Sequence, residues 1–194
     1  MYVASISNKN PRETIKKRTA LPEEEIDSII DQCVSNNLIA ENKKDLTEIG
    51  RGSIKVVLAG GVFDIIHPGH IHTLNSAKGL GDVLVVVIAT DKTAEKMKKR
   101  LPLHNQDQRK TLVDSLLMVD LGIVGHEGDI FKTVDFIRPQ IIALGYDQVH
   151  QEKFIKEGCK KINLEVKVAR LQSPIPEISS SIIEKKYGED IHDI

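Results

Sequence analysis

The amino-acid sequence predicts an α/β fold, with a five-stranded parallel sheet covered by helices on both faces and a small helical module in front of it. The main observation is that, after about residue 53, short apolar runs alternate with amphipathic stretches of helical length. Such alternation is typical of βαβ units. The 194 residues are 40% hydrophobic and 28% charged, which suits a chain with a real core. We therefore divide the chain into residues 1–52 and residues 53–194.

The elements of the larger part follow from the hydrophobic pattern. Residues 82–89 (DVLVVVIA) carry almost no polar interruption, which is typical of a strand buried on both faces. We expect strands at residues 54–59, 82–89, 120–124, 140–144 and 165–169, and helices at residues 69–78, 105–118, 129–137 and 149–162. Parallel sheets bind ligands beyond the carboxyl ends of their strands, so the residues directly after each strand are the first candidates for function.

The front of the chain has a different pattern. Helical sequences at residues 11–18 and 21–36 are followed by a possible hairpin between residues 38–40 and 44–47. A helix, a turn, a helix and a hairpin within about fifty residues resemble a winged-helix module. This resemblance is loose and covers residues 1–51.

Charge argues against nucleic acid as the main partner. Residues 1–50 hold seven basic and nine acidic side chains, and the second helix starts with three glutamates, Glu23 to Glu25, which phosphates would repel. The whole chain has a net charge of −1. DNA binding stays open as an alternative, but we expect a protein contact, dimerisation or packing on the body.

The sequence also indicates a cytoplasmic protein. No apolar run approaches the eighteen residues of a membrane-spanning helix, and the first residues have no apolar core of a secretory signal. Cys33 and Cys159 are isolated from each other and from histidine clusters, so we expect free thiols rather than a disulfide or a metal site.

The segment after the first strand carries the strongest functional signal. Gly60 and Gly61 allow a close approach of the backbone to a ligand, and His67 and His70 flank Pro68-Gly69, which can open the next helix. Two imidazoles beside the positive end of a helix form a site for an anion such as a nucleotide phosphate. The alternatives are two surface histidines or a metal site completed by Asp64.

This segment resembles the H-x-G-H nucleotidyltransferases, through His67-Pro68-Gly69-His70 preceded by Gly61-Val62-Phe63-Asp64. A second signature supports the resemblance, because residues 178–183 (ISSSII) are similar to the family's serine-rich helix start. The resemblance spans about residues 54–187. It implies a Rossmann-like sheet, a nucleoside triphosphate bound over the two histidines, and release of pyrophosphate.

Three further groups complete the expected phosphate site. Ser179 can cap the last helix, and it offers hydroxyl and N–H groups to phosphates together with Ser180 and Ser181. The resemblance implies a phosphate contact by a lysine of the run after the second strand, either Lys98 or Lys99. It also implies a functional Arg109, which could bind the acceptor phosphate or simply pair with a helix acid.

The segment after the fourth strand is expected to hold the nucleoside, through Gly145, Tyr146 and Asp147. Its L-G-x-D-Q form is similar to that of the archaeal FAD synthases, which adenylate FMN. That similarity implies backbone contacts of Val62 and Phe63 with the nucleotide. Val62 stands where that branch usually has threonine, and a cysteine of the branch is missing near the C-terminal serines.

The leading hypothesis is therefore transfer of AMP from ATP to FMN, assisted by Mg²⁺ or another divalent cation that arrives with the triphosphate, and with no separate metal site. A close alternative is transfer of CMP from CTP to glycerol 3-phosphate or ethanolamine phosphate, and phosphopantetheine is a less favoured acceptor. A nucleotide-sensing transcriptional regulator is the alternative from another class. By analogy with the family, a homodimer is a further expectation.

Overall fold

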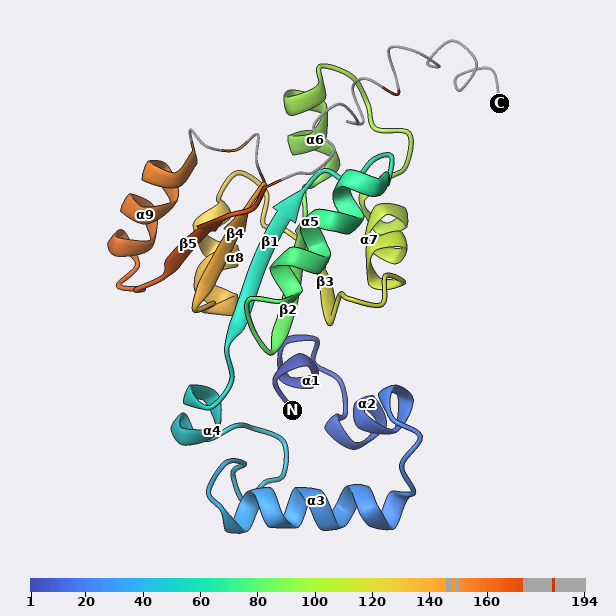
Figure 1. The fold of residues 1–194 in the computed structure, drawn as a ribbon, viewed down its shortest axis with the longest axis vertical. Coiled ribbons are helices and arrows are strands. Elements are labelled where there is room, and N and C mark those ends of the chain that lie inside the picture. Colours follow the sequence, from blue (N-terminus) through green and yellow to red (C-terminus); the bar gives the residue numbers. More distant parts are fainter. Residues whose placement is uncertain (146–147, 149–150, 173–182, 184–194) are drawn as a thin grey trace. The chain divides into compact units, whose positions relative to one another are not determined.

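The computed structural model describes residues 1–145, 148, 151–172 and 183, and these residues form two compact units that divide at Lys55 and Val56 (Figure 1). We describe each unit by itself. In the part of the chain that the structure describes, no helix is long and apolar enough to cross a membrane.

The first unit consists of short helices. Its elements are α1 (Tyr2–Ile6), α2 (Pro11–Arg18), α3 (Glu23–Ser35) and α4 (Glu48–Gly52), and an isolated antiparallel bridge joins Ile39 to Leu46. The two expected helices and the expected pairing between residues 38–40 and 44–47 are present. Helices α1 and α4 were not expected, because five-residue helices are too short to show periodicity.

Packing in this unit depends on a few buried side chains. Ile26 and Ile30 lie on the buried side of α3, and the Arg51 guanidinium lies 5.0 Å from the centre of the Tyr2 ring. Burial raises the pKa of Tyr2 to about 12. Gly50 is also required sterically, since a Cβ there would lie 1.8 Å from the carbonyl oxygen of Leu38.

The second unit is built on one sheet of five parallel strands. The strands are β1 (Val56–Gly61), β2 (Val83–Ile88), β3 (Leu121–Val124), β4 (Ile141–Leu144) and β5 (Lys167–Arg170), in the spatial order β3-β2-β1-β4-β5. All four pairings are parallel, as predicted. This is the Rossmann-like sheet that the family resemblance implied, with its order reversing between β1 and β4.

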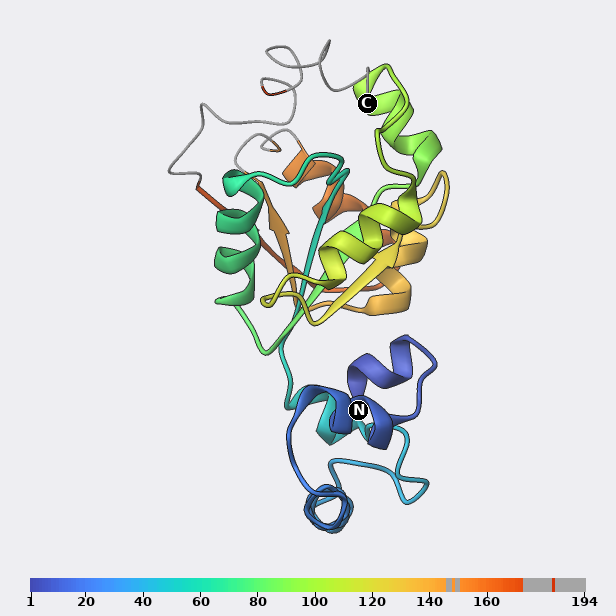
Figure 2. The same cartoon turned by 90° about the vertical axis from the view of Figure 1, so that its right-hand side faces the viewer.

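The helices cover both faces of this sheet. They are α5 (Pro68–Lys78), α6 (Asp91–Lys98), α7 (Gln106–Asp114), α8 (Ile130–Ile137) and α9 (Gln151–Lys161). Leu74 of α5 and Val113 of α7 share one apolar cluster with strand residues such as Val57 and Val86. Helix α8 lies on the other face, as Figures 1 and 2 show from two sides.

Two helix assignments from sequence need correction. Residues 91–98 form helix α6, where no helix was expected from the sequence. The start of α6 is capped by the Thr90 side chain, which accepts from the backbone N–H of Thr93. Helix α7 ends at Asp114, four residues before its expected end, and begins with a capping box between Asn105 and Gln108.

Candidate functional site

The candidate site lies where the strand order reverses. β1 is flanked by β2 on one side and by β4 on the other, so the chain leaves these strands in different directions at their carboxyl ends. Such a switch point leaves a crevice above the sheet. The segment that contains both histidines follows β1, and Gly145 directly follows β4.

The turn after β1 is unusual in its backbone. Phe63 has a φ of +54°, a left-handed conformation that costs energy for an aromatic residue. Its ring packs so close to Gly61 that a Cβ on this glycine would lie 3.0 Å from ring atoms. The same ring lies 5.1 Å from the imidazole of His70, measured between ring centres. Gly61 and Phe63 therefore help to place His70.

The two histidines form a close pair at the start of α5, with their ring planes tilted by 36°. His67 is the N-cap residue, Pro68 is the first helical residue, and the centres of the His67 and His70 rings are 3.9 Å apart. The Nδ1 atoms of both rings are buried, and neither has a hydrogen-bond partner among the described residues. No acidic residue occupies the first turn of α5. The helix end can therefore accept an external anion.

The surroundings of both imidazoles favour the neutral form. Burial, together with the positive charge of Lys98, holds the pKa of His67 below its usual value. For His70, burial and the nearby His67 and Lys98 lower the pKa to about 4. A bound anion would favour the protonated ring, because its charge offsets the desolvation of the imidazolium.

Lys98 is the lysine that the structure brings to the histidines. It is half-buried near the end of α6, and its charge acts on both imidazoles. Lys99, the other candidate, is exposed and ends the helix with a φ of +58°. The position of Lys98 suits a cation that faces the same anion as His67 and His70.

Arg109 has a role that differs from the predicted phosphate contact. Its side chain is fully buried and donates to three groups: the Val62 carbonyl at 2.7 Å, the His104 carbonyl at 2.9 Å and the Asp91 carboxylate at 2.7 Å. The structure thus shows the ion pair with a helix acid, which was the second sequence-based alternative. Arg109 ties the turn after β1 to the start of α6 and to the segment before α7.

Asp64, three residues before the H-x-G-H motif, was not recognised from sequence as a structural residue. It is 1% exposed, and one carboxylate oxygen accepts from the backbone N–H of Leu103 at 2.8 Å and of His104 at 3.3 Å. The other oxygen lies 2.9 Å from Nη2 of Arg100. Asp64 is therefore engaged with protein groups rather than offered to a metal, and the described residues contain no cluster of three or more potential metal ligands.

Several predicted site residues can be placed only in part. Val62 is buried with its carbonyl held by Arg109, Gly69 is buried and Pro68 is exposed. The Gly145 N–H donates to the Gln148 side chain at 3.1 Å, which shapes the loop after β4. The remaining predicted residues, Tyr146, Asp147, Ser179, Ser180 and Ser181, lie outside the described residues.

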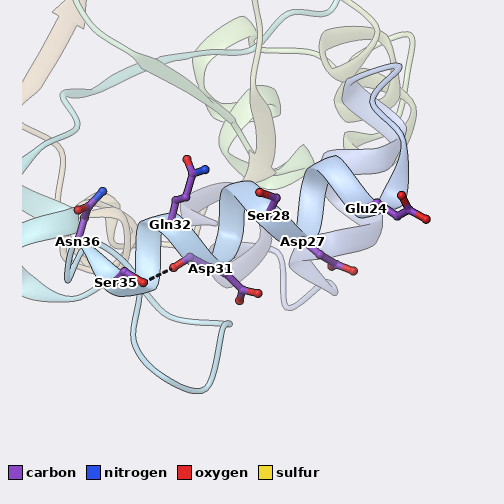
Figure 3. A pocket seen from close by; sticks show the side chains of 7 residues that line it. All are labelled: Glu24, Asp27, Ser28, Asp31, Gln32, Ser35 and Asn36. Atoms are coloured by element: carbon purple, nitrogen blue, oxygen red, sulfur yellow. Dashed lines mark hydrogen bonds between the residues drawn. The ribbon is translucent and has the colours of Figure 1, made fainter.

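A hollow lies on the first unit, along the solvent side of α3. Figure 3 shows its polar side chains along that helix and at its C-terminal end. It is lined by Glu24, Asp27, Ser28, Asp31, Gln32, Ser35 and Asn36. The lining contains three carboxylates and no basic residue, although Asp27 pairs with Arg12 and Asp31 with Lys43. The hollow itself therefore offers no cation to the phosphates of a nucleic acid.

Comparisons with known proteins agree with this geometry. A model of the cytidylyltransferase-like family matches residues 58–186. An FAD synthase of Picrophilus torridus is 51% identical over 125 residues, which cover 64% of this chain and 89% of that protein. An FAD synthase of Aciduliprofundum boonei is 52% identical over 133 residues, which cover 69% of this chain and 80% of that protein.

Solved structures show the same fold. The crystal structure of the lipopolysaccharide core biosynthesis protein from Thermoplasma volcanium is 44% identical, with a TM-score of 0.59, and the match covers 62% of this chain and 98% of that one. The pantoate-beta-alanine ligase of Francisella tularensis is 18% identical with a TM-score of 0.51, over 85% of this chain and 76% of that one, and shares the fold alone.

Proposed function

The chain belongs to the cytidylyltransferase-like family, and from this premise we propose that it transfers AMP from ATP to FMN, forming FAD and pyrophosphate. The observation that carries the chemistry is the close pair of imidazoles at the start of α5, with Lys98 near them. The choice of FMN and ATP is supported by the archaeal FAD synthases, which are 51% and 52% identical to this chain.

The reaction needs few protein groups. An oxygen of the FMN phosphate attacks the α-phosphorus of ATP, the new P–O bond forms, and the bond to the β-phosphate bridge oxygen breaks to release pyrophosphate. The attacking phosphate is already ionised near neutral pH, so no general base is required. His67, His70 and Lys98 would bind phosphate oxygens as negative charge develops on them.

We infer that a divalent cation enters with the triphosphate. Mg²⁺ is held mainly by phosphate oxygens and water in such complexes, and it neutralises charge on the departing pyrophosphate. Asp64, the acid closest in sequence to the histidines, is occupied by Leu103, His104 and Arg100. We therefore expect the protein to bind the triphosphate through His67, His70 and Lys98.

The other parts of the site follow from the family. We propose that Tyr146 and Asp147 bind the adenosine next to Gly145, at the end of β4, and that Ser179, Ser180 and Ser181 bind the phosphate tail.

The free thiols of Cys33 and Cys159 support a reducing compartment such as the cytoplasm.

We further propose that the first unit does not read DNA, because α3 presents carboxylates. A gel-shift experiment at low salt, with genomic fragments and with or without ATP, should show no change in mobility. A shift that weakens steeply with salt would instead establish nucleic-acid binding.

The decisive test is pyrophosphate release by the purified protein with Mg²⁺. FMN with ATP should give FAD and pyrophosphate. Glycerol 3-phosphate with CTP should release no pyrophosphate above background. Turnover only with CTP would replace the proposed function by a cytidylyltransferase of phosphorylated alcohols.

A further inference from the structure

The segment 97–101, which contains the end of α6 and the first residues after it, exposes two apolar side chains and partly buries two charged ones. Met97 and Leu101 are 58% and 67% exposed. Of the three cations between them, Lys99 is exposed, Lys98 is half-buried near the histidines, and the Arg100 side chain is only 20% exposed, against Asp64. Exposed single apolar residues are common, but two of them beside partly buried cations call for a physical reason.

The segment is fixed to the histidine turn rather than free. Arg100 lies 2.9 Å from Asp64, and the same carboxylate accepts from the backbone N–H of Leu103. These contacts hold both sides of Leu101 against the turn that follows β1. Met97 and Leu101 therefore stand at the rim of the site, on a well-anchored piece of backbone.

The direction of the segment is also informative. It follows β2, which lies on one side of β1, whereas Gly145 follows β4 on the other side. If adenosine binds beside β4, a second ligand that meets the phosphates at Lys98 would extend over the β2 side. The segment thus faces the half of the site that is left for the acceptor.

We propose that Met97 and Leu101 contact the isoalloxazine ring of FMN while Lys98 faces its phosphate; this inference rests on the proposed function. FMN joins a flat, largely apolar ring system to a dianionic phosphate. The segment offers the complementary pair, two apolar side chains around a cation, with Lys96 and Lys99 adding positive charge nearby. Covering Met97 and Leu101 with the ring removes apolar surface from water, which favours binding.

The test is the kinetics of a Met97→Gln, Leu101→Gln double variant. We expect its KM for FMN to rise roughly tenfold, because the glutamines lose the apolar contact but keep similar length. The KM for ATP should stay within about twofold. Equilibrium titration of FMN fluorescence, without ATP, should show the same weakening in the dissociation constant.

Two controls separate this contact from a general loss of structure. Leu117→Gln changes a fully exposed leucine before the amino end of β3, whereas residues 97–101 follow the carboxyl end of β2, and it should leave both KM values unchanged. Ribitol 5-phosphate has the phosphate and the sugar alcohol but no ring. Its inhibition constant should be the same for the wild type and the double variant.

The outcomes are distinct. An unchanged KM for FMN, or an equal rise for FMN and ATP, would overturn the assignment of these side chains to the ring. Weaker inhibition of the double variant by ribitol 5-phosphate would show that the substitutions disturb the phosphate site instead. A wild-type protein that neither binds FMN nor forms FAD would refute the proposed function, and this inference with it.

Discussion

Helices α3 and α5 both begin beside a proline, yet their first turns differ in charge. Pro22 precedes α3, and its first turn contains Glu23, Glu24 and Glu25. Pro68 is the first residue of α5, whose first turn contains no acid. The positive end of α3 is thus offset by the chain's own carboxylates, whereas that of α5 is open to a ligand.

The surroundings strengthen this contrast. Glu23 of α3 pairs with Lys16 and lies 3.5 Å from Arg12, so its charge serves contacts within the first unit. At α5 the imidazoles of His67 and His70 keep their buried Nδ1 atoms without hydrogen-bond partners among the described residues. Two helices that both begin beside a proline can therefore differ in role. The start of α3 contributes to contacts within the first unit, whereas the start of α5 is available for a ligand.

The largest expected effect comes from removing the ligand groups of α5. His67→Ala and His70→Ala should each lower kcat by about two to three orders of magnitude, equivalent to roughly 3–4 kcal/mol, because each removes a donor to the reacting phosphates. Rates of FAD formation measure this. His72→Ala on the same helix is the control, since its ring contacts Ser76 instead. Full activity in both alanine variants would contradict a catalytic role for the pair.

The second effect concerns pH. Because the pKa of His70 is lowered from 6.5 to about 4 in the folded protein, the unfolded chain takes up a proton first as the pH falls. Stability is therefore lost between about pH 6.5 and pH 4, by roughly 3 kcal/mol or less. Urea unfolding across this range should show a smaller loss for His70→Gln. If the wild type and His70→Gln lose the same free energy of unfolding over this pH range, His70 has the same pKa in the folded and unfolded states.

The third test makes α5 resemble α3. Pro68→Glu places a carboxylate at the exposed first position of α5, where it interacts with the helix end and repels the triphosphate. We expect the KM for ATP to rise about five- to tenfold. Pro68→Gln has the same shape without the charge and should stay close to wild type. Equal KM values for the two variants would assign the effect to loss of the proline.

The smallest effect should follow from making α3 resemble α5. Replacing Glu23, Glu24 and Glu25 by glutamine should lower the midpoint of thermal unfolding by a few degrees at most, because these side chains are exposed and screened. The kcat for FAD formation should not change. A loss of turnover in this folded variant would show that the first unit takes part in catalysis.

Much of the fold could be predicted because its signals are local. The apolar runs near residues 56–61 and 83–88 alternate with helical stretches, and the observed strands lie within two residues of the expected starts. The capped helix α6 was missed because its lysines were interpreted as a run of charges. Its cap, Thr90, depends on one side-chain hydrogen bond that composition does not reveal.

The candidate site was predicted less evenly. His67 and His70 could be found from sequence, since they share one turn of a single helix. Arg109 could not be placed, because its partners Val62, Asp91 and His104 are distant in sequence and meet only after the sheet forms. The same holds for Asp64, whose partners lie near residue 100.

The sequence by itself therefore determined the parallel α/β sheet and the histidine motif, because periodicity and helix-start chemistry act over a few neighbouring residues. Tertiary structure alone decided which lysine lies near the histidines, that Arg109 binds backbone carbonyls and Asp91, and that Met97 and Leu101 are exposed. The physical reason is that burial, electrostatic environment and long-range hydrogen bonds depend on segments brought together by folding.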